Sequence, residues 1–451
     1  MKVPRIALLA LLTGVVANAA CGSQPEGPHP NIILISADTL RADHVGVNGY
    51  HRATTPTIDA LAAGGVNFTS AYSQAPNTAP SHTSILTSLY PSVHGVLQHG
   101  QVPDEKLVTL PAALREAGYQ TGAFTQLSGE TFKPGFDTWH LIESGLQSGK
   151  GLGELTMVTD WVGERTAPWF VFLHSYDVHL PYAPQPDYVD MWAGDYEGPL
   201  EPDITRKLVD QINGETREDG PLIAVERLEV TARDLQFIID MYDAELRRLD
   251  DIYGRFFAKL REMDEWDNTI IVFLADHGEE FGEHGRWGRH TYTLNEELLR
   301  VPLIIAGPGV PVGQTIEAAV RLVDVAPTIL GLVGVENPQY FMGESLAPIW
   351  DGDERLPRQV VAERGVKIVE RTLIHAGFKY MDDGRLFDLK TDRWGSVDIA
   401  ADNPDIADRM ATSLLDWMGQ FATLAAVVRT DGEVQLSEED ERRLRALGYL
   451  Q

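Results

Sequence analysis

Four short apolar runs stand out along the chain, and none of them alternates hydrophobic with polar residues. They occupy residues 31–36, 169–173, 269–274 and 301–305. The runs are rich in β-branched and aromatic residues, which favour strands. A strand that is apolar on both faces is typical of a sheet covered by helices on both sides. The pattern therefore predicts a buried, largely parallel sheet.

Segments with helical periodicity lie between these runs. Residues 58–63, 110–117 and 237–260 repeat their apolar positions every three to four residues, and Gly118 closes the second of them. Strands that alternate with helices predict an α/β fold with a doubly wound sheet. In such folds ligands bind at the carboxyl edge of the strands, so polar residues just after a strand are the candidates for chemistry.

The remaining segments suggest an insertion and a second, smaller unit. Residues 184–220 are rich in Pro, Gly, Asp and Glu, which is typical of an inserted loop or lid. After Gly352 the pattern changes to short strands at 359–363, 366–373, 378–381 and 385–389, followed by a helix at 406–421. We therefore expect a main domain over residues 31–352 and a small C-terminal antiparallel-sheet subdomain over residues 353–451.

The first 20 residues are typical of a secretory signal peptide. Lys2 and Arg5 precede an apolar run that is too short to span a bilayer comfortably, and small residues lead to Cys21. This order resembles a bacterial lipoprotein signal, although Asn18 departs from the usual aliphatic residue. We expect an exported protein, in the periplasm or at the cell surface, anchored to a membrane through lipidated Cys21, with residues 21–30 as a linker. Simple cleavage after Ala20 is the alternative.

The composition excludes some classes of binding partner and of metal site. The 451 residues carry a formal net charge of −29, and the sequence pI is about 4.7. Such a charge repels nucleic acid, so we expect no nucleic-acid partner. Cys21 is the one cysteine, which excludes an intrachain disulfide and any site built from several cysteines.

Two strand ends carry residues that bind hard cations. Asp38 follows the first apolar run, and Asp276 with His277 follows the run at 269–274. Carboxylate and imidazole groups at equivalent strand ends predict a divalent metal site at one edge of the sheet. The alternatives are a helix cap for Asp38 and a turn with a surface His277.

A hydroxyl candidate lies at the start of a predicted helix. Pro80 suits a first helical turn, and Thr78 stands just before it, where free N–H groups favour an anion. Next to a cation, the Thr78 hydroxyl could bind the metal, lose its proton and attack phosphorus or sulfur. His82, one turn later, could orient it. An N-cap role for Thr78 is the alternative.

Two further segments offer substrate-binding and proton-transfer groups. His179 follows the run at 169–173 and could protonate a leaving group, while Asp177 could bind substrate or, with His179, a second ion. Arg289 offers a fork for a tetrahedral oxyanion, and His290 could hold an oxygen or a second metal. Each segment could instead be a polar surface loop.

Taken in order, these segments resemble the sulfatase family of the alkaline phosphatase superfamily. The resemblance runs from about Asn31 to the C-terminus and rests on the following segments: the Asp38 strand, residues 54–61, 80–82, 86–91, 275–278, 300–304, 324–328 and 444–450. It implies a doubly wound mixed sheet, a catalytic main domain and a metal held by Asp38, Asp276 and His277. Sulfatases use Ca, whereas an imidazole ligand favours Zn or Mn. We expect one bound metal ion, and a second ion is possible.

The chain departs from the family pattern at positions that the family uses for catalysis and for metal or sulfate binding. Sulfatases oxidise a Cys or Ser to formylglycine at the position of Thr78, and Thr cannot form that aldehyde. Thr39 replaces a second metal-binding Asp, His82 replaces an Arg, and a Lys motif is absent from residues 122–126. Relatives with a Thr nucleophile include phosphodiesterases and phosphoethanolamine or phosphoglycerol transferases.

We therefore expect a metal-dependent hydrolase of small-molecule or glycan sulfate, phosphate or phosphonate esters that attacks through Thr78. Transfer of a phosphoryl group to a glycan or lipid acceptor is one alternative. A noncatalytic protein that keeps only the anion pocket is the other.

Overall fold

The computed structural model describes residues 29–126, 131–142, 155–166, 168–216, 223–352, 358–365 and 369–430. Cys21, the expected signal peptide and the tail at 444–450 lie outside these residues. No helix in the described ranges combines the length and the apolar character that a membrane span requires.

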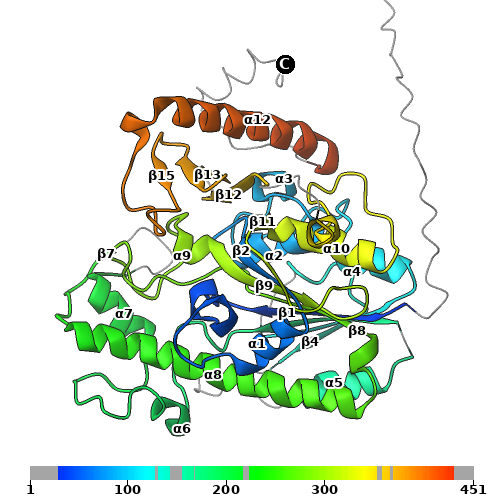
Figure 1. Ribbon diagram of the computed structural model, residues 1–451, viewed down its shortest axis with the longest axis horizontal. Helices are drawn as coiled ribbons and strands as arrows, with labels where there is room; N and C mark the ends of the chain where they lie inside the picture. Colours follow the sequence, from blue (N-terminus) through cyan, green and yellow to red (C-terminus); the bar gives the residue numbers. More distant parts are fainter. Residues whose placement is uncertain are drawn as a thin grey trace, which may run out of the picture.

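A large mixed sheet forms the centre of the main domain (Figure 1). Its strands are β1 (Asn31–Ala37), β2 (Gly65–Tyr72), β3 (Gln120–Thr125), β4 (Thr138–Leu141), β5 (Trp169–Ser175), β8 (Thr269–Leu274), β9 (Arg300–Ala306), β10 (Gln314–Ile316) and β11 (Val320–Arg321). Their order is β10-β2-β9-β8-β1-β5-β3-β4, with β11 also beside β2. All neighbours are parallel except β9, which runs antiparallel to β2 and β8. The four apolar runs are therefore confirmed as strands.

Helices cover both faces of this sheet, as the predicted fold class requires. Figure 1 shows α1 (Pro56–Ala63), α5 (Thr156–Gly163) and α8 (Ala232–Glu262) on one side, and α2 (Thr78–Thr87), α4 (Leu110–Glu116) and α10 (Val325–Leu332) on the other. The long helix α8 begins with a capping box, in which the Thr231 hydroxyl and the Asp234 carboxylate satisfy each other's backbone N–H groups. Its apolar face is buried under the sheet, with Phe237, Ile238 and Leu249 fully or almost fully buried.

The insertion after β5 forms a small layer of its own against α8. It contains α6 (Pro186–Val189), α7 (Arg206–Asn213), β6 (Glu215–Thr216) and β7 (Ile223–Ala224). Ile204 pairs with Tyr182 through two backbone hydrogen bonds of 3.1 and 2.8 Å, which fixes the start of α7 beside the loop that follows β5. The described part of the predicted insertion thus lies beside the polar edge of the sheet.

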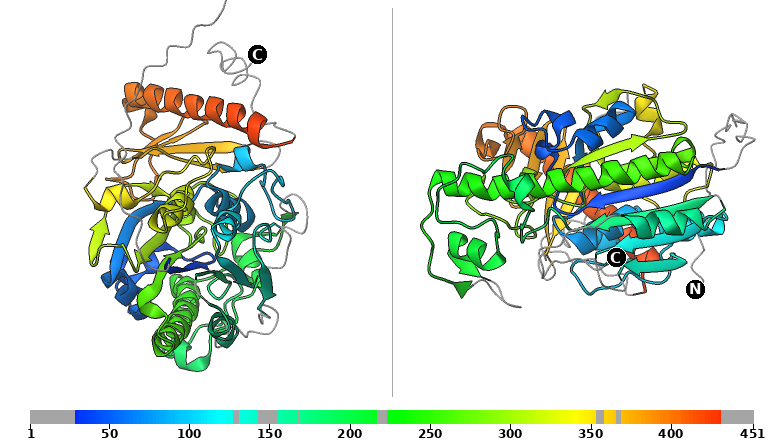
Figure 2. Two further views of the ribbon diagram at one scale, coloured as in Figure 1. Left: turned by 90° about the vertical axis from the view of Figure 1, so that its right-hand side faces the viewer. Right: turned by 90° about the horizontal axis from the view of Figure 1, so that it is seen from below.

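A second sheet follows α11 (Ala347–Trp350) and is antiparallel throughout. It consists of β12 (Val360–Arg364), β13 (Glu370–His375), β14 (Phe378–Met381) and β15 (Leu386–Asp388). Helix α12 (Pro404–Val428) covers it (Figure 2) and also packs on α3 (Pro91–His94) of the main domain. Leu373, Leu386 and Leu414 lie in the shared apolar core.

The carboxyl ends of three adjacent strands meet at one edge of the large sheet. The central order is β8-β1-β5, and the backbone N–H of Asp38 donates to the carbonyl of Ser175 at 2.9 Å. The residues that follow β1, β5 and β8 are therefore brought side by side, although they lie far apart in the sequence.

Candidate active site

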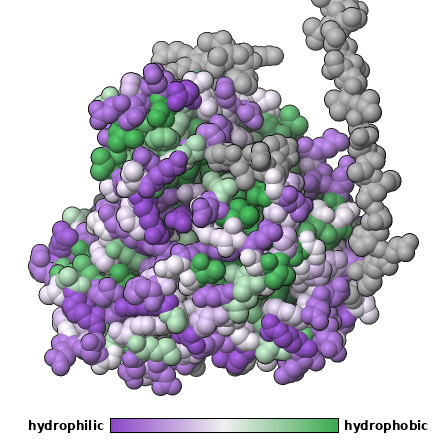
Figure 3. Space-filling model, in the orientation of Figure 1, coloured by the Kyte–Doolittle hydropathy of each residue, from purple (hydrophilic) through white to green (hydrophobic). Residues whose placement is uncertain are grey.

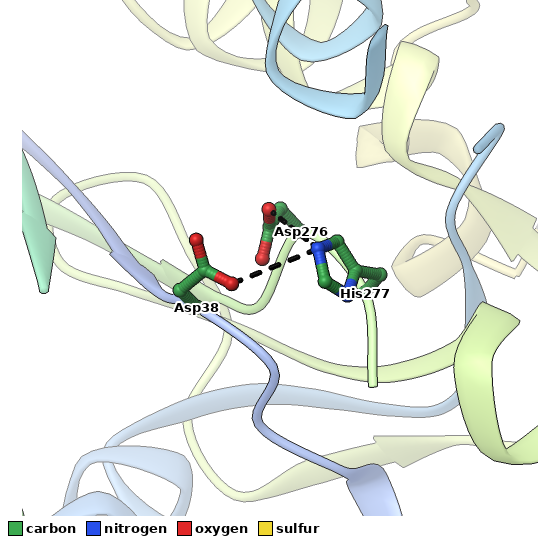
Figure 4. A group of neighbouring side chains, drawn as sticks. All are labelled: Asp38, Asp276 and His277. Atoms are coloured by element: carbon green, nitrogen blue, oxygen red, sulfur yellow. Dashed lines mark ion pairs between the residues drawn. The ribbon is translucent and has the colours of Figure 1, made fainter. Parts of the chain in front are cut away.

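Asp38, Asp276 and His277 converge at this edge of the sheet. Each offers one ligand atom, and these atoms lie within 4.8 Å of one another (Figure 4). The His277 Nε2 atom is 3.6 Å from Asp38 Oδ1 and 3.4 Å from Asp276 Oδ2. All three side chains are fully buried. The strand ends thus bring together the three residues that the sequence analysis assigned to a metal.

The polar atoms of this group fit a divalent cation. Asp38 Oδ1 and both carboxylate oxygens of Asp276 are buried and accept no hydrogen bond. A buried carboxylate oxygen without a donor is costly, whereas a cation would satisfy it. His277 donates from Nδ1 to the Gly278 carbonyl at 2.9 Å, which leaves Nε2 as the ligand atom, as in metal-binding histidines.

The electrostatics of the group are those of crowded, desolvated acids. Burial raises the pKa of Asp38 to about 6, against the opposing charges of His277 and His99. Burial, followed by the charge of Asp38, raises the pKa of Asp276. Burial opposes a proton on His277, but the charges of Asp276 and Asp38 outweigh it and raise the pKa of that imidazole. A bound cation would replace the positive charge that these carboxylates attract.

Thr78 presents its hydroxyl to the same group. It is the first residue of α2, and Oγ1 donates to Asp38 Oδ2 at 3.2 Å and lies 3.3 Å from His277 Nε2. The residue before the helix is Asn77, so Thr78 does not cap α2. The helix start therefore aims the hydroxyl at the candidate metal ligands.

His82 and His174 contact Thr78 and Asp38 and support their positions. His82 donates from Nδ1 to the Thr78 carbonyl at 2.9 Å, and its Nε2 accepts from the Ser36 hydroxyl at 2.9 Å. His174 Nε2 contacts Asp38 Oδ2 at 3.2 Å. Burial lowers the pKa of His82 to about 3 and that of His174 to about 4, so both rings are neutral at pH 7. His82 thus fixes the backbone of Thr78 rather than its hydroxyl.

His179 and His290 form a second layer beside His277. The rings of His277 and His290 are 4.6 Å apart, and those of His179 and His290 are 5.1 Å apart. Nδ1 of His290 lies 3.0 Å from Glu279 Oε1, and Nδ1 of His179 donates to the Leu180 carbonyl at 2.6 Å. Burial lowers the pKa of His179 to about 3, so its Nε2 carries a lone pair.

Asp177 and Arg289 each form an ion pair with another side chain of the protein. Asp177 pairs with Arg248 on α8, and Arg289 Nη2 donates to Asp210 Oδ1 of α7 at 2.6 Å. The structure therefore does not place either charge free at the metal group. The sequence could not reveal these partners, because they come from a distant helix and from the insertion.

Three site residues carried no role in the sequence analysis: His174, His99 and Arg206. His99, in the loop after α3, lies near enough to Asp38 for a protonated imidazole to lower the pKa of that carboxyl. Arg206, exposed at the first position of α7, is near enough to His179 and His290 for its charge to lower both pKa values, behind the larger effect of burial. A histidine at the end of an apolar strand was the available signal for His174. His99 lies in an irregular loop and Arg206 at the start of a helix in the insertion, and no sequence pattern links either residue to the site.

Comparisons with known proteins found matching families and similar structures. A family model described as Sulfatase matches residues 30–147 and 154–335, and one described as N-sulphoglucosamine sulphohydrolase, C-terminal, matches residues 282–416. The chain is 24% identical to the N-acetylglucosamine-6-O-sulfatase of Bacteroides thetaiotaomicron, with 86% of each protein covered.

Two solved structures are similar in fold. The phosphonate monoester hydrolase of Agrobacterium radiobacter matches with a TM-score of 0.70 and 23% identity, covering 87% of this chain and 96% of that one. The protein BT4656, solved with its substrate D-glucosamine-2-N,6-O-disulfate, matches with a TM-score of 0.71 and 21% identity, covering 87% and 98%.

Proposed function

The chain belongs to the sulfatase family of ester hydrolases in the alkaline phosphatase superfamily, and on that premise we propose that it cleaves sulfate or phosphate esters with Thr78 as the nucleophile. The observation that carries the proposal is the position of the Thr78 hydroxyl, 3.2 Å from Asp38 Oδ2 and 3.3 Å from His277 Nε2. A hydroxyl at a metal group and at a helix start suits attack on an anionic centre.

The residues present support a divalent ion such as Ca, Zn or Mn, held by Asp38, Asp276, His277 and the Thr78 hydroxyl. When bound, such an ion would acidify the hydroxyl and neutralise the charge of the transferred group. His174 would keep Asp38 oriented, because it contacts the same carboxylate oxygen as Thr78. His82 would hold the start of α2 in register with β1.

The proposed reaction forms a bond from Thr78 Oγ1 to sulfur or phosphorus and breaks the bond to the ester oxygen. Water then hydrolyses the covalent intermediate. The Thr78 proton must reach the departing alcohol, and His179 is the candidate carrier. Its Nε2 has a lone pair, so it accepts a proton before it can act as an acid.

Arg206 is the candidate cation for the nonbridging oxygens. Arg289, the choice from sequence, is already paired with Asp210, whereas Arg206 is exposed beside His179 and His290. His290 would add a second contact or a ligand for a second metal. The threonine favours phosphoryl chemistry, because it cannot be oxidised to the aldehyde that sulfatases use.

The substrate is proposed to be a small-molecule or glycan ester. The relatives named above act on a sulfated sugar and on phosphonate monoesters, and both classes carry an anion that suits the metal group and Arg206. Export and a lipid anchor at Cys21 are further parts of this proposal and rest on the N-terminal sequence alone.

Paired substrates test the proposal. Purified protein is assayed with an aryl sulfate, an aryl phosphodiester and an aryl phosphonate, beside Thr78→Ala. Thr83→Ala is the matched control, since it removes the same atoms from the same helix and its hydroxyl bonds only to the Ala79 carbonyl at 2.8 Å. Turnover on one class that Thr78→Ala loses and Thr83→Ala keeps supports the proposal. Equal turnover in Thr78→Ala, or none in the parent, contradicts it.

A further inference from the structure

A cleft lies between the large sheet and the small sheet, beside the carboxyl end of β2. Its volume is about 640 Å³, in the range of small-molecule sites. It is bounded by the end of β2 and start of β9 on one wall, and by the β13–β14 turn and the loop after β15 on the other. Because β2 runs parallel to β8 and β1, the cleft opens at the same edge of the sheet as the metal group.

Three cationic side chains line this cleft. Arg300 donates from Nε and Nη2 to the Thr69 carbonyl at 2.9 and 2.7 Å. Arg393 is half exposed and lies 3.7 Å from Asp43 Oδ2. Lys390 is exposed and passes over Gly377, where an added Cβ would lie 2.5 Å from its Cε. The three cations therefore line one space, and within the described part of the chain the one ion pair among them joins Arg393 to Asp43.

The acidic groups of the cleft do not balance this charge. Glu296 already accepts from the Lys379 ammonium at 3.0 Å and from the Tyr72 hydroxyl at 3.1 Å. Glu317 is exposed on the rim. Partial burial lowers the pKa of Arg393; the charges of Asp43 and Glu296 oppose this shift, and repulsion from Arg300 and Arg41 adds to it.

A group of three cations is unusual in a protein with so large a negative charge. The chain has a net charge of −29, and the face shown in Figure 3 is largely hydrophilic, with scattered hydrophobic patches. Cations crowded together in an acidic protein repel one another, and a bound anion would relieve that repulsion. Arginine forks in particular suit the planar or tetrahedral oxygens of such anions.

We propose that this cleft is a second anion-binding site, in which Arg300, Lys390 and Arg393 bind the sulfate, phosphate or carboxylate group of a small organic molecule or sugar. The site is distinct from the metal group and does not depend on Thr78 as a nucleophile. The anion can belong to a remote part of the substrate or to a separate small molecule, and both sources share this chemistry.

Binding of inorganic sulfate at constant ionic strength tests the site. Equilibrium dialysis with labelled sulfate compares the parent, Lys390→Gln/Arg393→Gln and the charge-matched control Lys259→Gln/Arg385→Gln. The control removes two exposed cations that pair at 3.0 and 2.8 Å with Glu262 and Asp383, outside the cleft. The cleft variant is expected to lose one bound equivalent or to bind it at least about tenfold more weakly. The control is expected to bind as the parent does.

Equal stoichiometry and affinity in the parent and the cleft variant would overturn the proposal. Kinetics with an ester that carries a second anionic group, beside one that lacks it, identify the source of the anion. If the substrate supplies it, KM of the doubly charged ester rises in the cleft variant alone. If a separate molecule supplies it, both KM values stay unchanged while sulfate binding falls.

Discussion

Thr78 Oγ1 donates a hydrogen bond of 3.2 Å to Asp38 Oδ2, although the two residues are 40 positions apart. Asp38 stands at the end of a fully buried strand, and Thr78 begins a helix that packs behind it. The hydrogen bond therefore joins the nucleophile candidate to a metal-ligand candidate through two rigid elements. Such placement gives a more precise site than a flexible loop would.

Metal binding should stabilise the folded protein. A ligand at a hundred times its Kd adds about 2.7 kcal/mol to the free energy of unfolding. Thermal unfolding in a chelator is expected to occur at lower temperature than with Ca, Zn or Mn added. In Asp276→Asn the metal-dependent rise in Tm should disappear, while the chelated variant unfolds at or above the parent Tm, since one buried charge is gone. A full metal response in Asp276→Asn would contradict the assigned ligands.

His174 should act through Asp38. Loss of a side chain that orients a ligand costs about 10- to 100-fold in metal affinity or activity. His174→Gln is expected to lower metal affinity in a competition titration by about that factor and to lower kcat at limiting metal, with KM little changed. Recovery of kcat at high metal concentration separates this positioning role from general misfolding. An unchanged metal Kd would exclude it.

Substitution of Arg206 should weaken substrate binding, whereas substitution of Arg289 should lower the stability of the fold. Arg206→Gln removes an exposed cation beside His179 and is expected to raise KM about tenfold with an unchanged Tm. Lys207→Gln, its exposed neighbour on α7, is the control. Arg289→Gln instead removes the ion pair with Asp210, which keeps only its hydrogen bond from Thr216 among those described, and should reduce the free energy of unfolding by about 1–3 kcal/mol. A KM effect in Lys207→Gln equal to that in Arg206→Gln would remove the special role of Arg206.

Glu280 should make the protein less stable as the pH rises. Burial, followed by the charge of Glu297, raises its pKa from 4.5 to about 7. Below pH 4.5 the group is protonated in both states and has no effect. Between pH 4.5 and 7 the unfolded state loses the proton first, so the free energy of unfolding falls, by up to about 3 kcal/mol.

Denaturant unfolding at pH 5 and pH 8 measures this effect. Glu280→Gln cannot ionise, so its loss of stability between the two pH values should be smaller than that of the parent. The same pH dependence in both proteins would show that Glu280 is not the group responsible.

Cys21 should determine where the protein is retained. In a bacterial host the parent is expected in the membrane fraction with a labelled fatty acid attached, whereas Cys21→Ser is expected in the soluble exported fraction. Fractionation and fatty-acid labelling measure this. Release of the parent into the soluble fraction would favour simple cleavage after Ala20.

The sequence predicted the elements that depend on local pattern. The apolar run before Asp38 and the run before Asp276 are adjacent strands, so strand ends were enough to group the metal candidates. The direction of β9 could not be predicted, because a strand buried on both faces has the same composition in either direction. The pairing of Arg289 with Asp210 was missed for another reason: α7 belongs to an irregular insertion whose position no periodicity indicates.

In the proposed reaction, Thr78 forms the covalent intermediate. The most direct measurement is mass spectrometry of protein quenched during turnover of the preferred ester, followed by peptide mapping. We expect a sulfated or phosphorylated peptide that contains Thr78 and disappears when turnover ends, with no such species and no turnover in Thr78→Ala. Turnover by Thr78→Ala, or a modified residue elsewhere in the parent, would contradict it.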